Sequence, residues 1–300
     1  MIAFGCSITD QDLYERYAEP GLRLASEPDS ELLVQGNAGS LFRSYNLLLD
    51  LAAKREDLDA LVLVHQDAEI VDPEFCAKLR EALADPDVAL VGCGGAVGVR
   101  SIAWWEGSVT WASFTTRFEE FGGGEVPGLS WDPDKVPPFA HTGEVDSIDG
   151  FAIGMSPWAV RELRFDESLG QIHGYDFDIC CQARAAGRKV VTADLRVIHH
   201  HSLDLIGDVE GWIAAHIAVA EKWEGRLPGV GVEGGDWRRR ARRAEAKAAA
   251  AQLIADLGTN HWAPRAQALE AELNRLKASR SWRLAAILRR IRNRLRLRRG

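Results

Sequence analysis

The chain has 300 residues, of which 46% are hydrophobic and 27% are charged, a composition that excludes an intrinsically disordered protein. The net charge of −8 hides a split, because residues 236–300 hold 18 basic and 5 acidic side chains whereas residues 1–235 hold 18 basic and 39 acidic ones. The acidic part would repel nucleic acid and anionic lipid, and the basic tail would attract either of them.

The first third of the chain alternates short apolar runs with amphipathic segments. The first helix should stop at Pro20-Gly21, because proline and glycine both interrupt helices. The unbroken apolar run 61–64 is typical of a strand buried on both faces. This alternation predicts an α/β fold with a mostly parallel sheet flanked by helices, in which ligands bind beyond the carboxyl ends of the strands. The predicted strands are 1–6, 32–34, 61–64 and 88–91, and the predicted helices are 10–19, 40–54 and one that opens at 72–74.

Residues 94–145 are rich in glycine, tryptophan and proline, and we expect a long irregular stretch that acts as a functional loop or lid. Regular structure should return at residues 147–156. The elements predicted after that are helices at 157–163, 175–186 and 209–223, a strand at 189–193, and a strand exit at the three histidines 199–201.

The tail is interrupted at Gly258 and Pro264, which predicts helices at 237–256, 265–278 and 282–298. The last helix places leucine and isoleucine on one face and arginine around the rest, the pattern of a basic amphipathic helix. We therefore expect an α/β domain at 1–232, a helical linker at 236–279 and a terminal basic helix at 280–300. An anionic membrane surface is the favoured partner of this tail, a partner helix is the second choice, and nucleic acid is unlikely.

Two segments carry candidate carboxylates. Asp67 and Glu69 follow the buried run 61–64, where carboxylate oxygens could bind a divalent cation such as Mn²⁺ or Mg²⁺; the alternative is a solvated turn. Asp176 opens the helix predicted at 175–186 and could act as a general base; alternatively, it is an acid favoured by the helix dipole.

Three further groups could complete a site. One of the histidines 199–201 could bind a metal, although polar residues at a strand exit are common. Trp105 and its neighbouring tryptophans could stack on a sugar or base, although tryptophan also fills cores. Asp149 and Gly150 could accept sugar hydroxyls and allow close approach, or form a simple turn.

Together, and in their order along the chain, these motifs resemble those of inverting, family 2-like glycosyltransferases with a GT-A fold. The resemblance is to the streptomycin-biosynthesis type, in which the strand before the site ends in His-x-Asp. The resemblance covers about residues 1–225. The matching positions are Asn46, the segment 64–67, the segment 147–150, the segment 165–167, the segment 174–178 and the segment 197–199.

The resemblance implies a role for each matching residue. Asp67 would bind the metal and diphosphate, His199 would be the late metal ligand, and Asp176 would be the catalytic base. His65 stands where the family has the first acid of Asp-x-Asp, at the usual sugar or ribose contact. The implied nucleotide- and sugar-binding residues are Ser7, Thr9, Asp10, Asn46, His65, Gln66, Trp105, Asp149, Gly150 and Tyr175.

The implied reaction is a single inverting displacement from a nucleotide-sugar donor to a hydroxyl of a carbohydrate or lipid-linked acceptor, with cell-surface glycan assembly expected from the family. A nucleotidyltransferase is a weaker alternative, because the segment 5–10 lacks a glycine-rich loop bearing Arg or Lys. A second alternative is a non-catalytic scaffold that binds a sugar nucleotide, because His65 stands where the family has an acid.

The expected location is the cytoplasm, with peripheral attachment to the inner face of the plasma membrane. Five cysteines without a CxxC pair suggest reduced thiols. The apolar run at the N-terminus is too short for a signal peptide and has no basic residues before it. No apolar run in the sequence approaches the length of a membrane span.

Overall fold

The computed structural model describes residues 1–119, 123–125, 130–131, 142–201, 209–226 and 263–278. The chain divides into two compact units, residues 1–242 and residues 243–300. The first unit contains the sheets and the candidate site. In the second unit the described element is the helix α9, Ala263–Ala278.

A seven-stranded sheet forms the centre of the first unit, in the order β2-β1-β3-β11-β5-β12-β9. Strands β1, β2 and β3 run parallel, β12 runs parallel to β5, and β11 and β9 are antiparallel to their neighbours. This confirms the predicted α/β fold with a mostly parallel sheet. The strands are β1 Ile2–Ile8, β2 Glu31–Gly36, β3 Ala60–His65, β5 Val88–Gly92, β9 Glu144–Val145, β11 Ala152–Met155 and β12 Lys189–Thr192.

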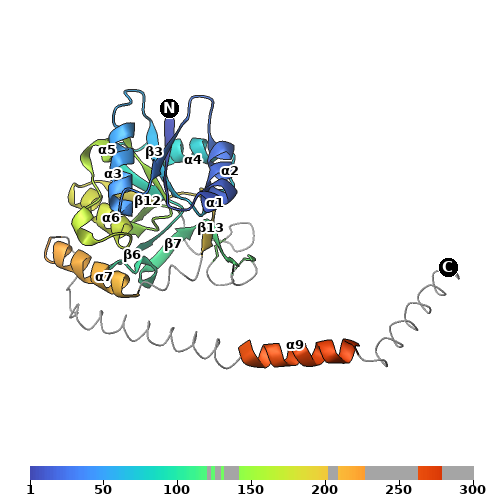
Figure 1. Ribbon diagram of the computed structural model, residues 1–300. Helices are drawn as coiled ribbons and strands as arrows, with labels where there is room; N and C mark the ends of the chain where they lie inside the picture. Colours follow the sequence, from blue (N-terminus) through green and yellow to red (C-terminus); the bar gives the residue numbers. More distant parts are fainter. Residues whose placement is uncertain (120–122, 126–129, 132–141, 202–208, 227–262, 279–300) are drawn as a thin grey trace. The chain divides into compact units, whose positions relative to one another are not determined.

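Helices cover both faces of this sheet (Figure 1). Successive side chains of β1 point to opposite faces, as they must in a strand. A β-carbon on Gly5 would meet Leu48 of α3, whereas the ring of Phe4 lies 6.1 Å from the ring of Phe75 in α4. Helices α3 Leu41–Ala52, α5 Pro157–Glu162 and α6 Tyr175–Ala185 share the first face, and α2 Glu19–Ala25 and α4 Phe75–Ala82 share the second.

The first predicted helix does not stop at Pro20-Gly21. It starts at α1, Gln11–Leu13, widens into a π-helical turn at Tyr14–Ala18 and continues as α2. Pro20 lies just after the π-helical turn, inside this continuous helix, which therefore includes a residue that has no N–H to donate. Gly21 is required for packing, because a β-carbon there would overlap the backbone of Ile70. The prediction was wrong because it assumed that proline and glycine end a helix. The sequence alone does not show which residues they contact in the folded protein.

The expectation of an irregular stretch at 94–145 was also wrong for much of its length. This stretch contributes strands to two smaller sheets, β10-β6-β7 and β4-β13-β8, as well as β9 of the central sheet. Most of these strands also pair with segments distant in sequence, and β6 begins with two glycines, so the local pattern is weak. The added strands are β4 Ala68–Ile70, β6 Gly94–Val97, β7 Ser108–Ala112, β8 Phe114–Phe118, β10 Ser147–Ile148 and β13 Val197–His201.

Helix α7, Val209–Trp223, has the predicted bounds and is held against the domain by a buried carboxylate. Asp178 of α6 accepts a hydrogen bond from Nε1 of Trp223 at 2.7 Å and pairs with Nζ of Lys222 at 2.8 Å. Helix α9 confirms the predicted helix at 265–278. The helices predicted at 237–256 and 282–298 lie outside the described residues. Within the described part of the chain, no helix has the length and apolarity needed to cross a bilayer.

Candidate active site

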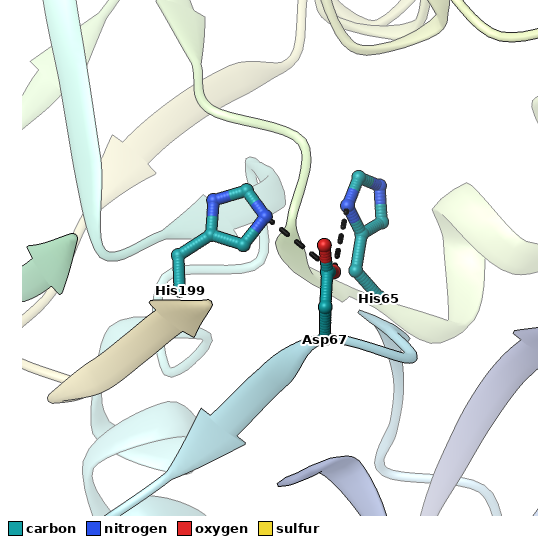
Figure 2. A group of neighbouring side chains, drawn as sticks. All are labelled: His65, Asp67 and His199. Atoms are coloured by element: carbon teal, nitrogen blue, oxygen red, sulfur yellow. Dashed lines mark ion pairs between the residues drawn. The ribbon is translucent and has the colours of Figure 1, made fainter. Parts of the chain in front are cut away.

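His65, Asp67 and His199 converge at the carboxyl end of β3. Their potential ligand atoms all lie within 4.8 Å of one another. Oδ1 of Asp67 is 3.8 Å from Nδ1 of His65 and 3.5 Å from Nε2 of His199. Figure 2 shows both imidazole rings directed toward the carboxylate from opposite sides. We call these residues the His-Asp-His group.

The strand pairing explains this convergence of residues that are far apart in sequence. His65 ends β3, and Asp67 lies in the short connection to β4. Strand β13 runs antiparallel to β4 with His199 opposite Ala68, which brings the histidine next to Asp67. The ring of Phe151 stacks on His199 with centroids 4.4 Å apart. Asp67 and His199 are therefore held in a largely buried, preorganised arrangement, with side-chain exposures of 9% and 7%.

The second ring nitrogen of His65 contacts a buried tyrosine. Nε2 of His65 lies 2.6 Å from the hydroxyl of Tyr175, the first residue of α6. Burial lowers the pKa of His65 to about 4, with Asp67 opposing and His199 adding to that effect. Burial raises the pKa of Tyr175 well above its usual value. At neutral pH the imidazole is therefore uncharged and the phenol keeps its proton.

The donor set of the His-Asp-His group suits a divalent cation. Two imidazole nitrogens and one carboxylate oxygen are ordinary ligands of such ions, and neutral imidazoles have a free lone pair to offer. A site with no more than three protein ligands would leave positions open for a substrate or water, as catalytic metal sites require. The residues present therefore fit the cation that the sequence predicted.

Two further carboxylates, those of Asp176 and Asp149, influence each other near the start of α6. Asp176 follows Tyr175 in the first turn of α6, and its Oδ1 accepts a hydrogen bond from the N–H of Phe177 at 2.8 Å. Burial, and next the charge of Asp149, raise the pKa of Asp176 to about 7. Burial likewise raises the pKa of Asp149. A β-carbon on Gly150 would meet both the hydroxyl of Tyr175 and Cβ of Asp176, so the loop that holds Asp149 packs against the start of α6.

Of the two neighbouring tryptophans, Trp104 contacts Asp149. Nε1 of Trp104 donates a hydrogen bond to Oδ2 of Asp149 at 3.0 Å, and its side chain is 5% exposed. Trp105 is 56% exposed and meets Trp104 edge to face, with centroids 6.5 Å apart. Sequence reasoning also missed Phe151. Its position directly after Asp149-Gly150 was the available signal.

Gln66 joins the predicted residues that follow β1. Its Oε1 accepts hydrogen bonds from the N–H groups of Thr9 and Asp10 at 2.7 and 2.9 Å, and its Nε2 donates to Oγ1 of Thr9. Asp10 caps α1 through the N–H of Leu13. Ser7 pairs with His65 across the two strands. The structure thus brings this loop to the edge that carries the His-Asp-His group.

Other predicted residues have partners away from the group. The amide of Asn46 exchanges two hydrogen bonds of 2.9 Å with the backbone of Phe165, so it holds the segment that precedes α6. Glu69 is not brought to the His-Asp-His group, because it pairs with Ile198 across β4 and β13 and therefore faces the side opposite to His199. Its carboxylate instead lies 2.9 Å from Nε2 of His200, whose ring stacks on Tyr17.

The comparisons with known proteins point to two biosynthetic relatives. No protein-family model matches the chain. The chain is similar to the streptomycin biosynthesis protein StrF of Streptomyces griseus, with 28% identity over 207 residues that cover 67% of this chain and 67% of StrF. It is also similar to the O-antigen biosynthesis protein RfbC of Myxococcus xanthus, with 28% identity over 182 residues that cover 57% of this chain but 13% of RfbC.

Among solved structures, the chain is similar to the mannosyltransferase PcManGT from Pyrobaculum calidifontis in complex with GDP-Man and Mn²⁺. That similarity covers 94% of this chain and 82% of the other, with 13% sequence identity and a TM-score of 0.45.

Proposed function

We propose that this chain is a metal-dependent glycosyltransferase with a GT-A arrangement. It would transfer a sugar from a nucleotide-diphosphate donor to an acceptor hydroxyl with inversion at the anomeric carbon. The observation that carries the proposal is the convergence of His65, Asp67 and His199 at the carboxyl end of β3, together with the contact between His65 and Tyr175, the residue that precedes Asp176. The two relatives are proteins of streptomycin and O-antigen biosynthesis, which agrees with a biosynthetic role.

Each residue has a defined task in this reaction. Asp67 and His199 would hold a divalent cation, which supplies the positive charge that neutralises a departing diphosphate. Asp176, with a pKa of about 7, takes the proton of the acceptor hydroxyl as that oxygen attacks the anomeric carbon. Asp149, held by Trp104, lies beside the base and is placed to accept hydroxyls of the sugar or acceptor.

A donor screen tests the proposal. The full chain is incubated with Mn²⁺ and a panel of nucleotide sugars, and sugar release and transfer are followed by mass spectrometry. We expect turnover of one donor class with release of the nucleoside diphosphate. Release of a sugar 1-phosphate, with transfer of the nucleoside monophosphate, would instead identify a nucleotidyltransferase. Tight donor binding with no turnover on any acceptor would identify a non-catalytic scaffold and overturn the proposal.

We also propose that residues 280–300, outside the described residues, attach the enzyme to an anionic membrane surface on the cytoplasmic side. This would place the site near a lipid-linked acceptor. The support is the sequence pattern of arginines around a leucine face, together with Trp282. Sedimentation with anionic vesicles should fall when residues 280–300 are removed, and unchanged sedimentation would rule this role out.

A further inference from the structure

We propose that His65 is a third metal ligand, and that the resulting set of two imidazoles and one carboxylate makes the site prefer first-row transition ions to Mg²⁺ and Ca²⁺. The inference rests on the proposed metal-dependent function and specifies its cofactor. It also changes the role of His65, which the sequence assigned to sugar or ribose contact.

The orientation of His65 supports this role. Its Nδ1 faces Oδ1 of Asp67 at 3.8 Å, across the carboxylate from Nε2 of His199 (Figure 2). Its Nε2 lies 2.6 Å from the hydroxyl of Tyr175. Both ends of the ring are therefore engaged. A rotated ring would lose the contact with Tyr175, so the structure keeps Nδ1 aimed at the position that Asp67 and His199 share.

Tyr175 also selects the proton arrangement that a ligand needs. A neutral imidazole has one protonated nitrogen, and a metal-binding nitrogen must be the other one. When Nδ1 offers its lone pair, Nε2 carries the proton and donates it to the hydroxyl oxygen of Tyr175. Tyr175 is thus a positioning residue, an outer partner of the kind that fixes metal-binding histidines.

The number of carboxylates decides the ion preference. Among the described residues, the His-Asp-His group contains a single carboxylate, and the nearby Glu69 is turned toward His200. Mg²⁺ and Ca²⁺ need mostly oxygen ligands, whereas imidazole favours transition ions, whose affinity rises from Mn²⁺ through Co²⁺. One carboxylate and two neutral imidazoles leave a bound divalent ion with a net charge of +1, which still attracts a diphosphate.

Calorimetric titration of the metal-free full chain with Co²⁺, Mn²⁺ and Mg²⁺ tests the preference. We expect Co²⁺ to bind the wild type about 100-fold more tightly than Mg²⁺, because two of the three ligands are imidazoles. In His65→Asp, which restores an oxygen ligand, this ratio should fall about tenfold or more. His200→Gln is the matched control, because His200 faces Glu69, and its ratio should stay that of the wild type. Equal binding of Co²⁺ and Mg²⁺ by the wild type, or an unchanged ratio in His65→Asp, would overturn the proposal.

If His65→Asp fails to fold, a measurement on the wild type still tests the proposal. Proton NMR of the Co²⁺-loaded chain should show two paramagnetically shifted, exchangeable imidazole N–H signals, one from each ligating histidine. A single signal would exclude His65 as a ligand. Tyr175→Phe should weaken Co²⁺ binding about tenfold, the usual effect of losing an outer-shell hydrogen bond. If the spectrum shows two such signals but the donor screen shows no sugar transfer, the proposed function is wrong and the assignment of His65 as a metal ligand still holds.

Discussion

The hydroxyl and ring of Tyr175 occupy the space where a side chain on Gly150 would begin. A β-carbon at position 150 would overlap Oη and Cζ of Tyr175 and crowd Cβ of Asp176. Glycine therefore lets the first turn of α6 press against the loop between β10 and β11. That contact places Tyr175 against His65 and positions Asp176 beside Asp149.

Gly150→Ala should weaken both the fold and the site. We expect a loss of about 1–3 kcal/mol in the free energy of unfolding, because the added methyl group must displace Tyr175 or the backbone. Gly36→Ala is the matched control, since a β-carbon there meets nothing within 4 Å. Urea denaturation of both variants measures the difference. Equal stabilities would mean that α6 can shift away at little cost.

Asp67→Asn should abolish metal binding and metal-dependent transfer. The amide keeps the size of the carboxylate but loses its charge, which is the one negative charge in the His-Asp-His group. We expect metal affinity to fall about 100-fold or more. Glu69→Gln is the control, because Glu69 bonds to His200, and its Mn²⁺ affinity by calorimetry should stay within about threefold of wild type. Strong weakening in the control would place Glu69 in the metal site.

Asp176→Asn should lower the transfer rate by about 10²–10⁴-fold while donor affinity is retained, as expected for loss of a general base. The base acts when deprotonated, and its pKa is about 7. In the wild type the rate should therefore rise about tenfold per pH unit below pH 7 and level off above it. Steady-state kinetics across pH 5–9 measures this profile. Wild-type turnover in the variant would refute the assignment.

The same pKa predicts an opposite trend in stability. Folding raises the pKa of Asp176, so the folded state holds the proton more tightly than the unfolded state does. This contribution is complete below the unfolded pKa and is lost as the pH rises through about 7. In metal-free protein, Asp176→Asn should raise the melting temperature more at pH 8 than at pH 5. An equal change at both values would show that Asp176 titrates normally.

Tyr45→Phe should leave the protein as stable as the wild type or make it more stable. Tyr45 is fully buried, and among the described residues its hydroxyl has no hydrogen-bond partner. An unpaired buried polar group costs about 1–3 kcal/mol, which phenylalanine would recover without changing the ring. Calorimetric melting measures the effect. A clear loss of stability would reveal a bonded water or another partner of the hydroxyl.

Local sequence patterns determined most of the secondary structure near the site. The apolar run of β3, the cap at Ser40 before α3 and the bounds of α7 follow from periodicity and capping, which depend on neighbouring residues. The same reasoning identified Asp67 and the histidine trio as residues at strand ends. The order of strands and helices was sufficient to predict a mostly parallel α/β sheet.

Tertiary structure decided which of these candidates meet. The register of β13 on β4 brings His199 to Asp67, and the alternation of β4 turns Glu69 toward His200. The contact with Tyr175 aims Nδ1 of His65 at the same point, and Trp104 donates a hydrogen bond to Asp149. These choices depend on pairings between strands and helices far apart in sequence. Local periodicity carries no information about such pairings, whereas a shift of one residue in a strand reverses which side chains face the site.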